Sequence, residues 1–317
     1  DAEWIIHAAT NDLPCLAEVR FLPARLFDTE LAARLLGFER VNLSALMEHF
    51  LGVGLAKKFS AEDWSARPLP RSWRTYAALD VERLADLRDA LAAELEAAGR
   101  LDIALQEFAH LAAHAADPPA VHPDPWRRTA NIHLVHTQRG LAVVRELWLT
   151  RDAIARRTDT APSKILVDKG ITELAAQLER AKKVAAGDLL KLPAFARKGA
   201  KPYLKDWADA ANRALALPDS QLPTRSRGKE PHAQQWRWKK SFPQLAARYD
   251  RVREEVSALA ERTRIPVVQL LEPDLLRRVL WETKDGGPAD AVALLAQLDA
   301  RHWQIELVAP ILAAHWR

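Results

Sequence analysis

Short apolar runs alternate with amphipathic stretches at the start of the chain. Trp4–His7 is apolar and β-branched, a pattern that predicts a buried strand. The elements expected after it are a helix over 8–19, a second extended segment over 20–27, and helices over 29–36 and 42–50, the last with Asn42 as its N-cap. Because strands alternate with helices, we expect this part of the chain to form an α/β sheet domain.

Helical periodicity dominates the remainder. The helices expected there span 71–97, 130–156, 171–185, 201–217, 242–262, 272–281, 288–299 and 303–316. No strand is expected after residue 101. A Pro-rich break at 117–125 and a polar, basic break at 222–231 separate the blocks. The boundaries predict an α/β domain over residues 1–118 and two all-α bundles over 119–221 and 222–317.

The two helical blocks share an outline. In each, a long first helix ends in an Arg-rich turn, Leu149–Arg156 in one block and Val256–Arg262 in the other. A turn containing proline follows at Ala161–Leu166 and at Ile265–Leu271. The repetition predicts a duplicated helical module. A chance similarity of two amphipathic bundles is the alternative.

Charge is uneven along the 317 residues, although the net charge is only +4. Between Lys191 and Lys240 there are twelve basic residues and four acidic ones, which indicates contact with a polyanion. The single cysteine, Cys15, excludes an intrachain disulfide and a multi-cysteine metal site, and it fits a reducing, cytoplasmic location. With no signal peptide visible and no apolar run near the roughly 18 to 20 residues that span a bilayer, we expect no membrane association.

Tyr76 and Asp80 are four residues apart on a predicted helix, so they project from one face. A carboxylate binds a hard divalent cation such as Mg²⁺, and a phenol one turn away can hold a water beside it. Asp12 is a second candidate, because it lies just beyond a predicted strand and is well placed to enter a cleft. The alternatives are a half-buried helix for the first pair and a helix first-turn aspartate for Asp12.

Three ordered motifs resemble a known family. His7–Leu13 is similar to the second motif of DEDD-type 3′–5′ exonucleases, and Asp63–Leu69 to the Asp-Trp-x-x-Arg-Pro-Leu stretch of ribonuclease D. Tyr76–Asp80 is similar to the third motif in its tyrosine form. The helical blocks resemble paired HRDC modules, a nucleic-acid-binding unit shared with RecQ-type helicases. The resemblance covers nearly the whole chain and implies a partial ribonuclease H-like exonuclease domain followed by two HRDC-like bundles.

The resemblance also implies a chemistry. Asp12 would hold one of two divalent ions, Mg²⁺ or Mn²⁺, Asp80 would hold the other, and Tyr76 would orient the attacking water. The reaction implied is hydrolysis of RNA from its 3′ end with release of mononucleotides. Phosphoryl transfer agrees with this assignment, because it needs positioning and cationic charge more than covalent help.

One feature departs from the family pattern. The first motif, Asp-x-Glu on the opening strand, should precede His7, and Asp1-Ala2-Glu3 is too close to Asp12 to serve. Asp28-Thr29-Glu30 has the same spelling but follows the second motif, so Asp28 is interpreted as a helix N-cap. We therefore expect a truncated or partly disordered front end, and weak hydrolysis by these residues alone.

Other candidates are less specific. Lys57 stands where the family often has a lysine and is expected near substrate phosphate, with a solvated loop lysine as the alternative. His110 and His114 are spaced as in zinc proteases, but Leu111 replaces the glutamate that such sites need, so a plain helix is favoured. The chain contains no Gly-x-x-x-x-Gly-Lys-Ser/Thr loop, which argues against a helicase motor.

Two basic segments predict RNA contact. The first is the turn around Gly199, where Arg197, Lys198 and Lys201 would present cations and amides to phosphate. In the second segment, Trp236 and Trp238, interleaved with Arg237, would stack on unpaired bases. The alternative for both segments is a solvated basic surface with tryptophans in the core.

The leading hypothesis is a 3′–5′ exoribonuclease that acts on the single-stranded 3′ end of structured RNA precursors such as tRNA. A DNA exonuclease on the same scaffold and a non-catalytic nucleic-acid-binding protein are the alternatives. No protein partner can be inferred from the sequence.

Overall fold

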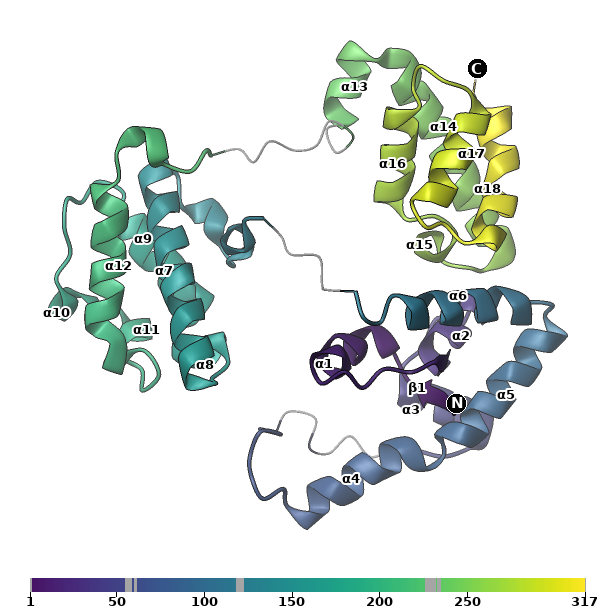
Figure 1. The fold of residues 1–317 in the computed structure, drawn as a ribbon, viewed down its shortest axis with the longest axis horizontal. Coiled ribbons are helices and arrows are strands. Elements are labelled where there is room, and N and C mark those ends of the chain that lie inside the picture. The colour runs from purple at the N-terminus through teal and green to yellow at the C-terminus, as the bar shows by residue number, and fades with distance from the viewer. Residues whose placement is uncertain are drawn as a thin grey trace. The chain divides into compact units, whose positions relative to one another are not determined.

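A computed structural model describes residues 2–54, 59, 62–117, 123–225, 232 and 235–316. The chain divides into two compact units (Figure 1). The first unit combines Asp1–Pro119 with Lys229–Arg317, and the second contains Ala120–Gly228. Among the described residues, no helix combines the length and the apolar character that crossing a membrane requires.

The first unit begins with a small parallel sheet. Strand β1 (Glu3–Ile6) pairs with β2 (Arg25–Asp28), and Glu3 lies opposite Arg25 in the register. Both strands were predicted to within one residue at their C-terminal ends, but β2 begins at Arg25, five residues after the start of the extended segment predicted over 20–27. The helix predicted over 8–19 is wrong in its first part, because the chain forms a 3₁₀ turn, η1 (Ala9–Asn11), before α1 (Leu13–Glu18).

Two short helices follow the sheet, and both begin at side-chain caps. Asp28 caps α2 (Thr29–Leu36), as predicted, and its carboxylate accepts the backbone N–H of Glu30 at 2.9 Å. Asn42 caps α3 (Leu43–Leu51) and accepts the Ala45 N–H at 3.0 Å, which also confirms its predicted role. Side-chain caps of this kind satisfy amides that have no partner inside the helix.

The predicted helix over 71–97 is two helices, α4 (Arg71–Glu82) and α5 (Leu84–Ala97), separated at Arg83. The two helices differ in burial. Four leucines of α5 lie in the core, whereas α4 buries no residue. The apolar stripe that drives packing therefore belongs to α5 alone. Helix α6 (Leu101–Ala113) completes this part of the unit.

The second part of the first unit is entirely helical in its described residues. Its helices are α13 (Gln235–Ser241), α14 (Pro243–Thr263), α15 (Val267–Leu270), α16 (Pro273–Glu282), α17 (Pro288–Gln297) and α18 (His302–Ala314). Its buried side chains share one hydrophobic core with those of α2, α3, α5 and α6. Glu107 on α6 also accepts the Arg301 guanidinium at 2.6 Å. The predicted first and third domains share this core and form one compact unit. The division of the chain into three domains therefore stays a prediction.

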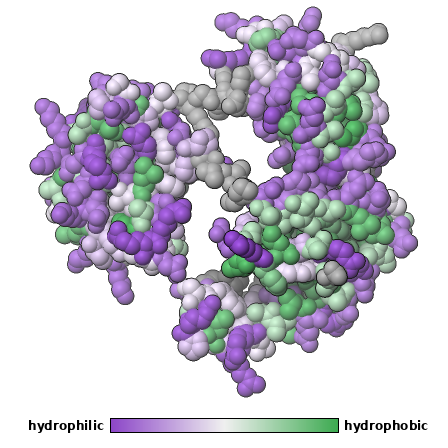
Figure 2. Space-filling view, in the orientation of Figure 1, coloured by the Kyte–Doolittle hydropathy of each residue, from purple (hydrophilic) through white to green (hydrophobic). Residues whose placement is uncertain are grey.

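The second unit has its own core around the buried side chains of Phe195 and Trp207. Its helices are α7 (Gln138–Thr158), α8 (Pro162–Ile165), α9 (Asp168–Gln177), α10 (Ala186–Leu189), α11 (Pro193–Ala196) and α12 (Leu204–Ala216). The helix predicted from residue 130 begins at Gln138 instead, because Thr137 caps it by accepting the Gly140 N–H at 2.9 Å. Hydrophilic side chains cover much of the visible face of this unit, while hydrophobic ones gather over the N-terminal elements of the first unit (Figure 2).

The two long helices α7 and α14 open the same succession of elements. Each has 21 residues and ends at a residue with left-handed backbone, Asp159 with φ 47° and Arg264 with φ 56°. A four-residue helix follows in both cases, α8 or α15, and then a ten-residue helix, α9 or α16. The shared outline that the sequence predicted is therefore present in the backbone of both blocks.

Candidate active site

Asp12, Tyr76 and Asp80 line one cavity of about 810 Å³ in the first unit. The cavity lies among β1, the start of α1, the start of α3 and the C-terminal half of α4. Its other lining residues are Trp4, Ile5, Ile6, His7, Cys15, Leu16, Asn42, Leu43, Ser44, Val81 and Leu84. The three residues singled out in the sequence are thus brought together, although they come from different elements.

Asp12 reaches this cavity because the chain turns sharply after β1. Ala8 adopts left-handed backbone with φ 61°, and η1 then carries the chain to Asp12 just before α1. The Asp12 side chain makes no capping hydrogen bond to α1. The alternative of an aspartate that serves the helix terminus therefore has no hydrogen bond to support it, and the carboxylate is exposed at the cavity.

A buried carboxylate fixes that turn. Asp28 is only 2% exposed, and it accepts the backbone N–H groups of Ala8 at 3.0 Å and Ala9 at 2.8 Å as well as those of its own helix. Burial raises the pKa of Asp28, and its backbone hydrogen bonds oppose that shift. Asp28 thus serves the structure of the site and does not line the cavity.

Tyr76 and Asp80 share one face of α4 with Trp73. All three side chains are half-buried, whereas the residues between them are exposed. The Tyr76 ring packs near Phe59 and Trp64, with centroid distances of 6.0 and 6.3 Å. Burial raises the pKa of Asp80, because an ionised carboxylate loses hydration there. Aromatic packing therefore orients the face of α4 that carries both candidate groups.

His7 is a polar lining residue to which the sequence analysis gave no separate role. Its Nδ1 lies 2.9 Å from the Thr29 hydroxyl, and burial lowers its pKa although Asp28 and Glu30 act in the opposite direction. The imidazole is therefore favoured in its neutral form. Its position at the start of the second motif was the signal available in the sequence. Asn42 and Ser44 also line the cavity, and Asn42 had been interpreted only as a cap.

The predicted basic turn lies in the second unit, apart from the cavity residues in sequence. Arg197, Lys198 and Lys201 are exposed, as RNA contact requires. The expectation that the turn also presents its amides is wrong in part, because the N–H groups of Ala200 and Lys201 both donate to the Arg197 carbonyl. The amides of Ala200 and Lys201 are therefore already paired, while the cations of Arg197, Lys198 and Lys201 are exposed. Lys57 lies outside the described residues.

The two tryptophans of the second basic segment lie on α13 and differ in exposure. Trp236 is 71% exposed, and the Arg237 guanidinium lies 5.0 Å from the centre of its ring. Trp238 is only 1% exposed and stacks on Trp281 with a centroid distance of 5.7 Å. The expectation that Trp238 stacks on RNA bases is therefore wrong, because its ring fills the core. The geometry leaves Trp236 and Arg237 as the accessible pair.

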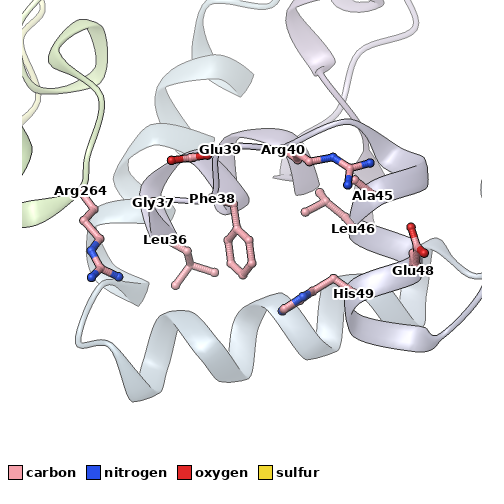
Figure 3. Close-up of a pocket in the computed structure, with 10 residues that line it drawn as sticks. All are labelled: Leu36, Gly37, Phe38, Glu39, Arg40, Ala45, Leu46, Glu48, His49 and Arg264. Carbon is pink, nitrogen blue, oxygen red and sulfur yellow. The ribbon is translucent and has the colours of Figure 1, made fainter.

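A second cavity, of about 620 Å³, lies beside the loop between α2 and α3 (Figure 3). Phe38 and His49 face one another there with ring centres 5.1 Å apart, and Arg264 lies at one end. Gly37, with φ 86°, allows close approach to Arg264, since an added Cβ would stand 2.6 Å from the Arg264 Cβ. The cavity contains none of the residues predicted from the sequence, and we assign no chemistry to it.

Known families match three segments of the chain. Residues 1–96 match the family described as 3′-5′ exonuclease, residues 140–210 match the HRDC domain, and residues 231–316 match the family described as 3′ to 5′ exonuclease C-terminal domain. The chain therefore combines an exonuclease domain containing a small sheet with one HRDC helical domain. A second HRDC domain is not confirmed, because the last segment matches a different family.

Individual relatives make the class more specific. The chain is 34% identical over 243 residues to ribonuclease D of Gluconacetobacter diazotrophicus. The aligned region covers 71% of this chain and 56% of that protein. A crystal structure of a protein from Bifidobacterium adolescentis is 37% identical with a TM-score of 0.84, covering 100% of this chain and 79% of that one. The crystal structure of Escherichia coli RNase D has a TM-score of 0.62 at 24% identity, covering 89% and 72%, and supports the fold.

These comparisons show that the chain is similar to ribonuclease D and contains segments that match 3′-5′ exonuclease families and an HRDC domain. The chain spans little more than half the length of the curated relatives it matches, 56% to 58% of the first three. The activity, substrate and partners of the whole protein therefore do not follow from these comparisons alone.

Proposed function

We propose that the chain is part of a metal-dependent 3′–5′ exoribonuclease that removes nucleoside monophosphates from RNA 3′ ends. The observation that carries this proposal is the cavity shared by Asp12, Tyr76 and Asp80. The relation to ribonuclease D supports RNA as the substrate. The solved Escherichia coli enzyme is described as involved in structured RNA processing, which supports maturation of tRNA or another stable RNA as the cellular task.

The residues at the cavity fit divalent cations. Oxygen ligands from carboxylates suit Mg²⁺ and Mn²⁺, and Asp12 and Asp80 supply them at the cavity. When bound, such ions lower the pKa of water and stabilise charge on the phosphate. Tyr76 would orient the water with its hydroxyl, and its contacts with Phe59 and Trp64 support this role. Trp4 and Leu16 give the cavity an apolar side on which a nucleobase can rest.

Asp12 and Asp80 are the carboxylates that line the cavity within the described residues. Two ions need more ligands than two carboxylates provide, and the family pattern supplies them through an Asp-x-Glu motif. Glu3 is not a substitute, because its carboxylate is 2.9 Å from the Arg88 guanidinium. We therefore expect the 317 residues alone to hydrolyse RNA weakly, and rapid Mg²⁺-dependent hydrolysis would contradict this part of the proposal.

The helical blocks are proposed to guide the single-stranded 3′ tail. Supporting groups are the exposed cations Arg197, Lys198 and Lys201 of the HRDC domain and the exposed pair Trp236 and Arg237. Lys57 is proposed to contact a phosphate. The matching succession of elements from α7 to α9 and from α14 to α16 supports a common origin of the two blocks, with the last block as a diverged HRDC-like module.

Metal and RNA binding test the proposal without relying on the rate of hydrolysis. Mn²⁺ binding is measured by calorimetry in the unaltered chain and in Asp12→Asn, Asp80→Asn and Tyr76→Phe variants. Loss of either carboxylate is expected to weaken Mn²⁺ binding at least about tenfold, because a direct ligand is removed. Tyr76→Phe should leave binding unchanged, since the phenol is assigned to water and not to the ion.

Glu82→Gln is the matched control, because Glu82 is an exposed carboxylate on α4 that does not line the cavity. Equal Mn²⁺ affinity in all variants would exclude the proposed site. Matched RNA and DNA oligomers with single-stranded 3′ ends distinguish the substrate class. Tighter binding of the DNA oligomer would favour a DNA exonuclease instead.

A further inference from the structure

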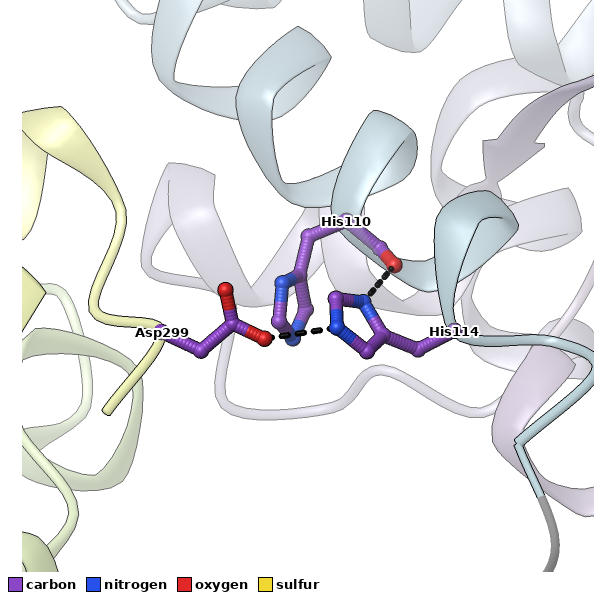
Figure 4. A group of neighbouring side chains, drawn as sticks. All are labelled: His110, His114 and Asp299. Atoms are coloured by element: carbon purple, nitrogen blue, oxygen red, sulfur yellow. Dashed lines mark hydrogen bonds and ion pairs between the residues drawn. The ribbon is translucent and has the colours of Figure 1, made fainter. Parts of the chain in front are cut away.

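A second group of potential ligands lies at the joint between the two parts of the first unit. His110 lies in the last turn of α6, His114 is the C-cap residue of the same helix, and both face Asp299 in the turn between α17 and α18 (Figure 4). The ligand atoms of the three side chains lie within 4.8 Å of one another. His114 Nε2 is 2.6 Å from Asp299 Oδ2, and the two imidazole rings have centres 4.2 Å apart.

The orientation of His114 is already suited to metal binding. Its Nδ1 lies 2.8 Å from the His110 carbonyl oxygen, to which it donates in the matching tautomer. Histidines that bind metals commonly donate their other ring N–H to a backbone carbonyl, which fixes the tautomer and directs the remaining nitrogen to the ion. Burial lowers the pKa of His110, which favours its neutral form, whereas the hydrogen bond to the His110 carbonyl and the Asp299 carboxylate raise the pKa of His114, so metal binding there displaces a proton.

The surroundings hold Asp299 at this place. Asp299 has φ 70°, a left-handed backbone that is uncommon for a residue with a side chain. Next to it, Glu107 on α6 accepts Arg301 Nε at 2.6 Å and Trp303 Nε1 at 2.8 Å, which ties the start of α18 to α6. The pairing with Glu107 offsets the charge of Arg301. A second carboxylate, that of Asp117, lies 4.0 Å from His114 Nε2.

We propose that His110, His114 and Asp299 form a binding site for a divalent transition-metal ion of the Zn²⁺ class. Two imidazoles and one carboxylate are a ligand set that Zn²⁺ accepts in proteins, with a fourth position for water or for Asp117. Mg²⁺ prefers oxygen ligands and is not expected here. The bound ion fastens α6 to the α17–α18 turn, and so joins the first and last segments of the first unit.

Zn²⁺ titration of the metal-stripped chain tests the site directly. Calorimetry is expected to show Zn²⁺ binding that persists in excess Mg²⁺, and Co²⁺ is expected to give visible absorption typical of tetrahedral nitrogen and oxygen ligands. His114→Ala and Asp299→Asn should each weaken Zn²⁺ binding at least about tenfold, since each removes a direct ligand. The double variant Asp12→Asn with Asp80→Asn should keep it, which separates this inference from the proposed function.

His302→Ala is the matched control. This exposed histidine on α18 has one carboxylate neighbour, Glu306, at 3.5 Å, and its loss should leave Zn²⁺ affinity unchanged. Zn²⁺ should raise the melting temperature of the unaltered chain but not of Asp299→Asn, whose melting without metal shows that it is folded. Unchanged Zn²⁺ affinity in His114→Ala and Asp299→Asn, or its loss in the Asp12 and Asp80 double variant, would overturn the proposal.

Discussion

The Asp28 carboxylate accepts the backbone N–H of Ala9 at 2.8 Å, and this hydrogen bond joins the end of β2 to the turn that follows β1. The same side chain bonds Ala8 and caps α2, so one buried group fixes two connections at once. Asp12 stands three residues beyond Ala9. Its position at the cavity therefore depends on a residue that does not line the cavity.

Replacing Asp28 with alanine should destabilise the first unit by about 3 kcal/mol, because a helix cap is lost and buried amides are left without acceptors. Urea unfolding followed by circular dichroism measures the change. Asn42→Ala is the control, since Asn42 accepts one N–H group, at an exposed cap. Its expected cost is about 1 kcal/mol. Equal costs for the two variants would show that the bonds to Ala8 and Ala9 contribute nothing.

His7 should make the first unit less stable in mild acid. Its pKa is lowered in the folded chain by burial, so the unfolded chain binds a proton first as the pH falls below about 6.5. The contribution of the neutral ring to the free energy of unfolding is fully present above pH 6.5. This contribution is lost as the pH falls from there through the lower pKa of His7 in the folded chain. Unfolding free energies at pH 7.5 and 5.5 should differ less in His7→Gln than in the unaltered chain. An identical pH dependence would contradict this assignment.

Gly199 is predicted to be intolerant of any side chain. An added Cβ would lie 1.9 Å from the Lys164 carbonyl oxygen, a backbone atom that cannot move aside easily. Gly199→Ala should therefore destabilise the HRDC domain by about 2 kcal/mol or more, measured by thermal unfolding. Gly187→Ala is the matched control, because no atom lies within 4 Å of its added Cβ. A neutral Gly199→Ala would mean that the close approach is not maintained in solution.

Charge reversal at Arg197, Lys198 and Lys201 should weaken binding of single-stranded RNA and flatten its salt dependence. Each lost phosphate contact is expected to reduce the slope of log affinity against log salt by about 0.7. Fluorescence anisotropy at several salt concentrations measures both quantities. The control is a charge reversal at three other exposed cations of the same domain, Arg157, Lys182 and Lys183. This control should change the slope less. The same slopes in both triple variants would exclude a specific contact at the turn.

Replacing the two tryptophans of α13 with alanine should affect different properties, stability for Trp238 and RNA affinity for Trp236. Trp238→Ala removes a core ring and is expected to cost about 3 to 5 kcal/mol of stability. Trp236→Ala should change stability by less than about 0.5 kcal/mol, yet weaken RNA binding by about 1 to 3 kcal/mol if its exposed ring stacks on a base. Urea unfolding and RNA anisotropy measure the two effects. Unchanged RNA affinity in Trp236→Ala would remove this residue from the RNA surface.

Local signals in the sequence predicted local structure well. Asn42 and Asp28 were recognisable as caps because a short polar side chain stands directly before an apolar periodic run. The helix break at Arg83 could not be recognised in the sequence, because neither glycine nor proline marks it. Only the packing shows that the buried apolar stripe starts at Leu84. The meeting of Asp12 with Tyr76 and Asp80 was reached through family motifs, because no spacing rule relates a strand end to a distant helix.

Burial decided the cases that the sequence left open. Trp236 and Trp238 have nearly the same surroundings in sequence, and their helical phase alone places one in solvent and the other in the core. The cluster at His110 and His114 was set aside because Leu111 excludes a zinc-protease motif. The carboxylate beside the two histidines is that of Asp299, which the packing of α6 against the last helices brings near.

The shared core of the first unit bears on how the chain folds during synthesis. The apolar side chains of α5 and α6 share a core with those of α14 and α18, which are synthesised after the second unit. The intervening unit has a core of its own and can collapse earlier. The N-terminal segment therefore stays incompletely packed until these helices are made, and a stop codon after the middle unit would release a protein whose sheet-bearing part lacks the core side chains of α14 and α18.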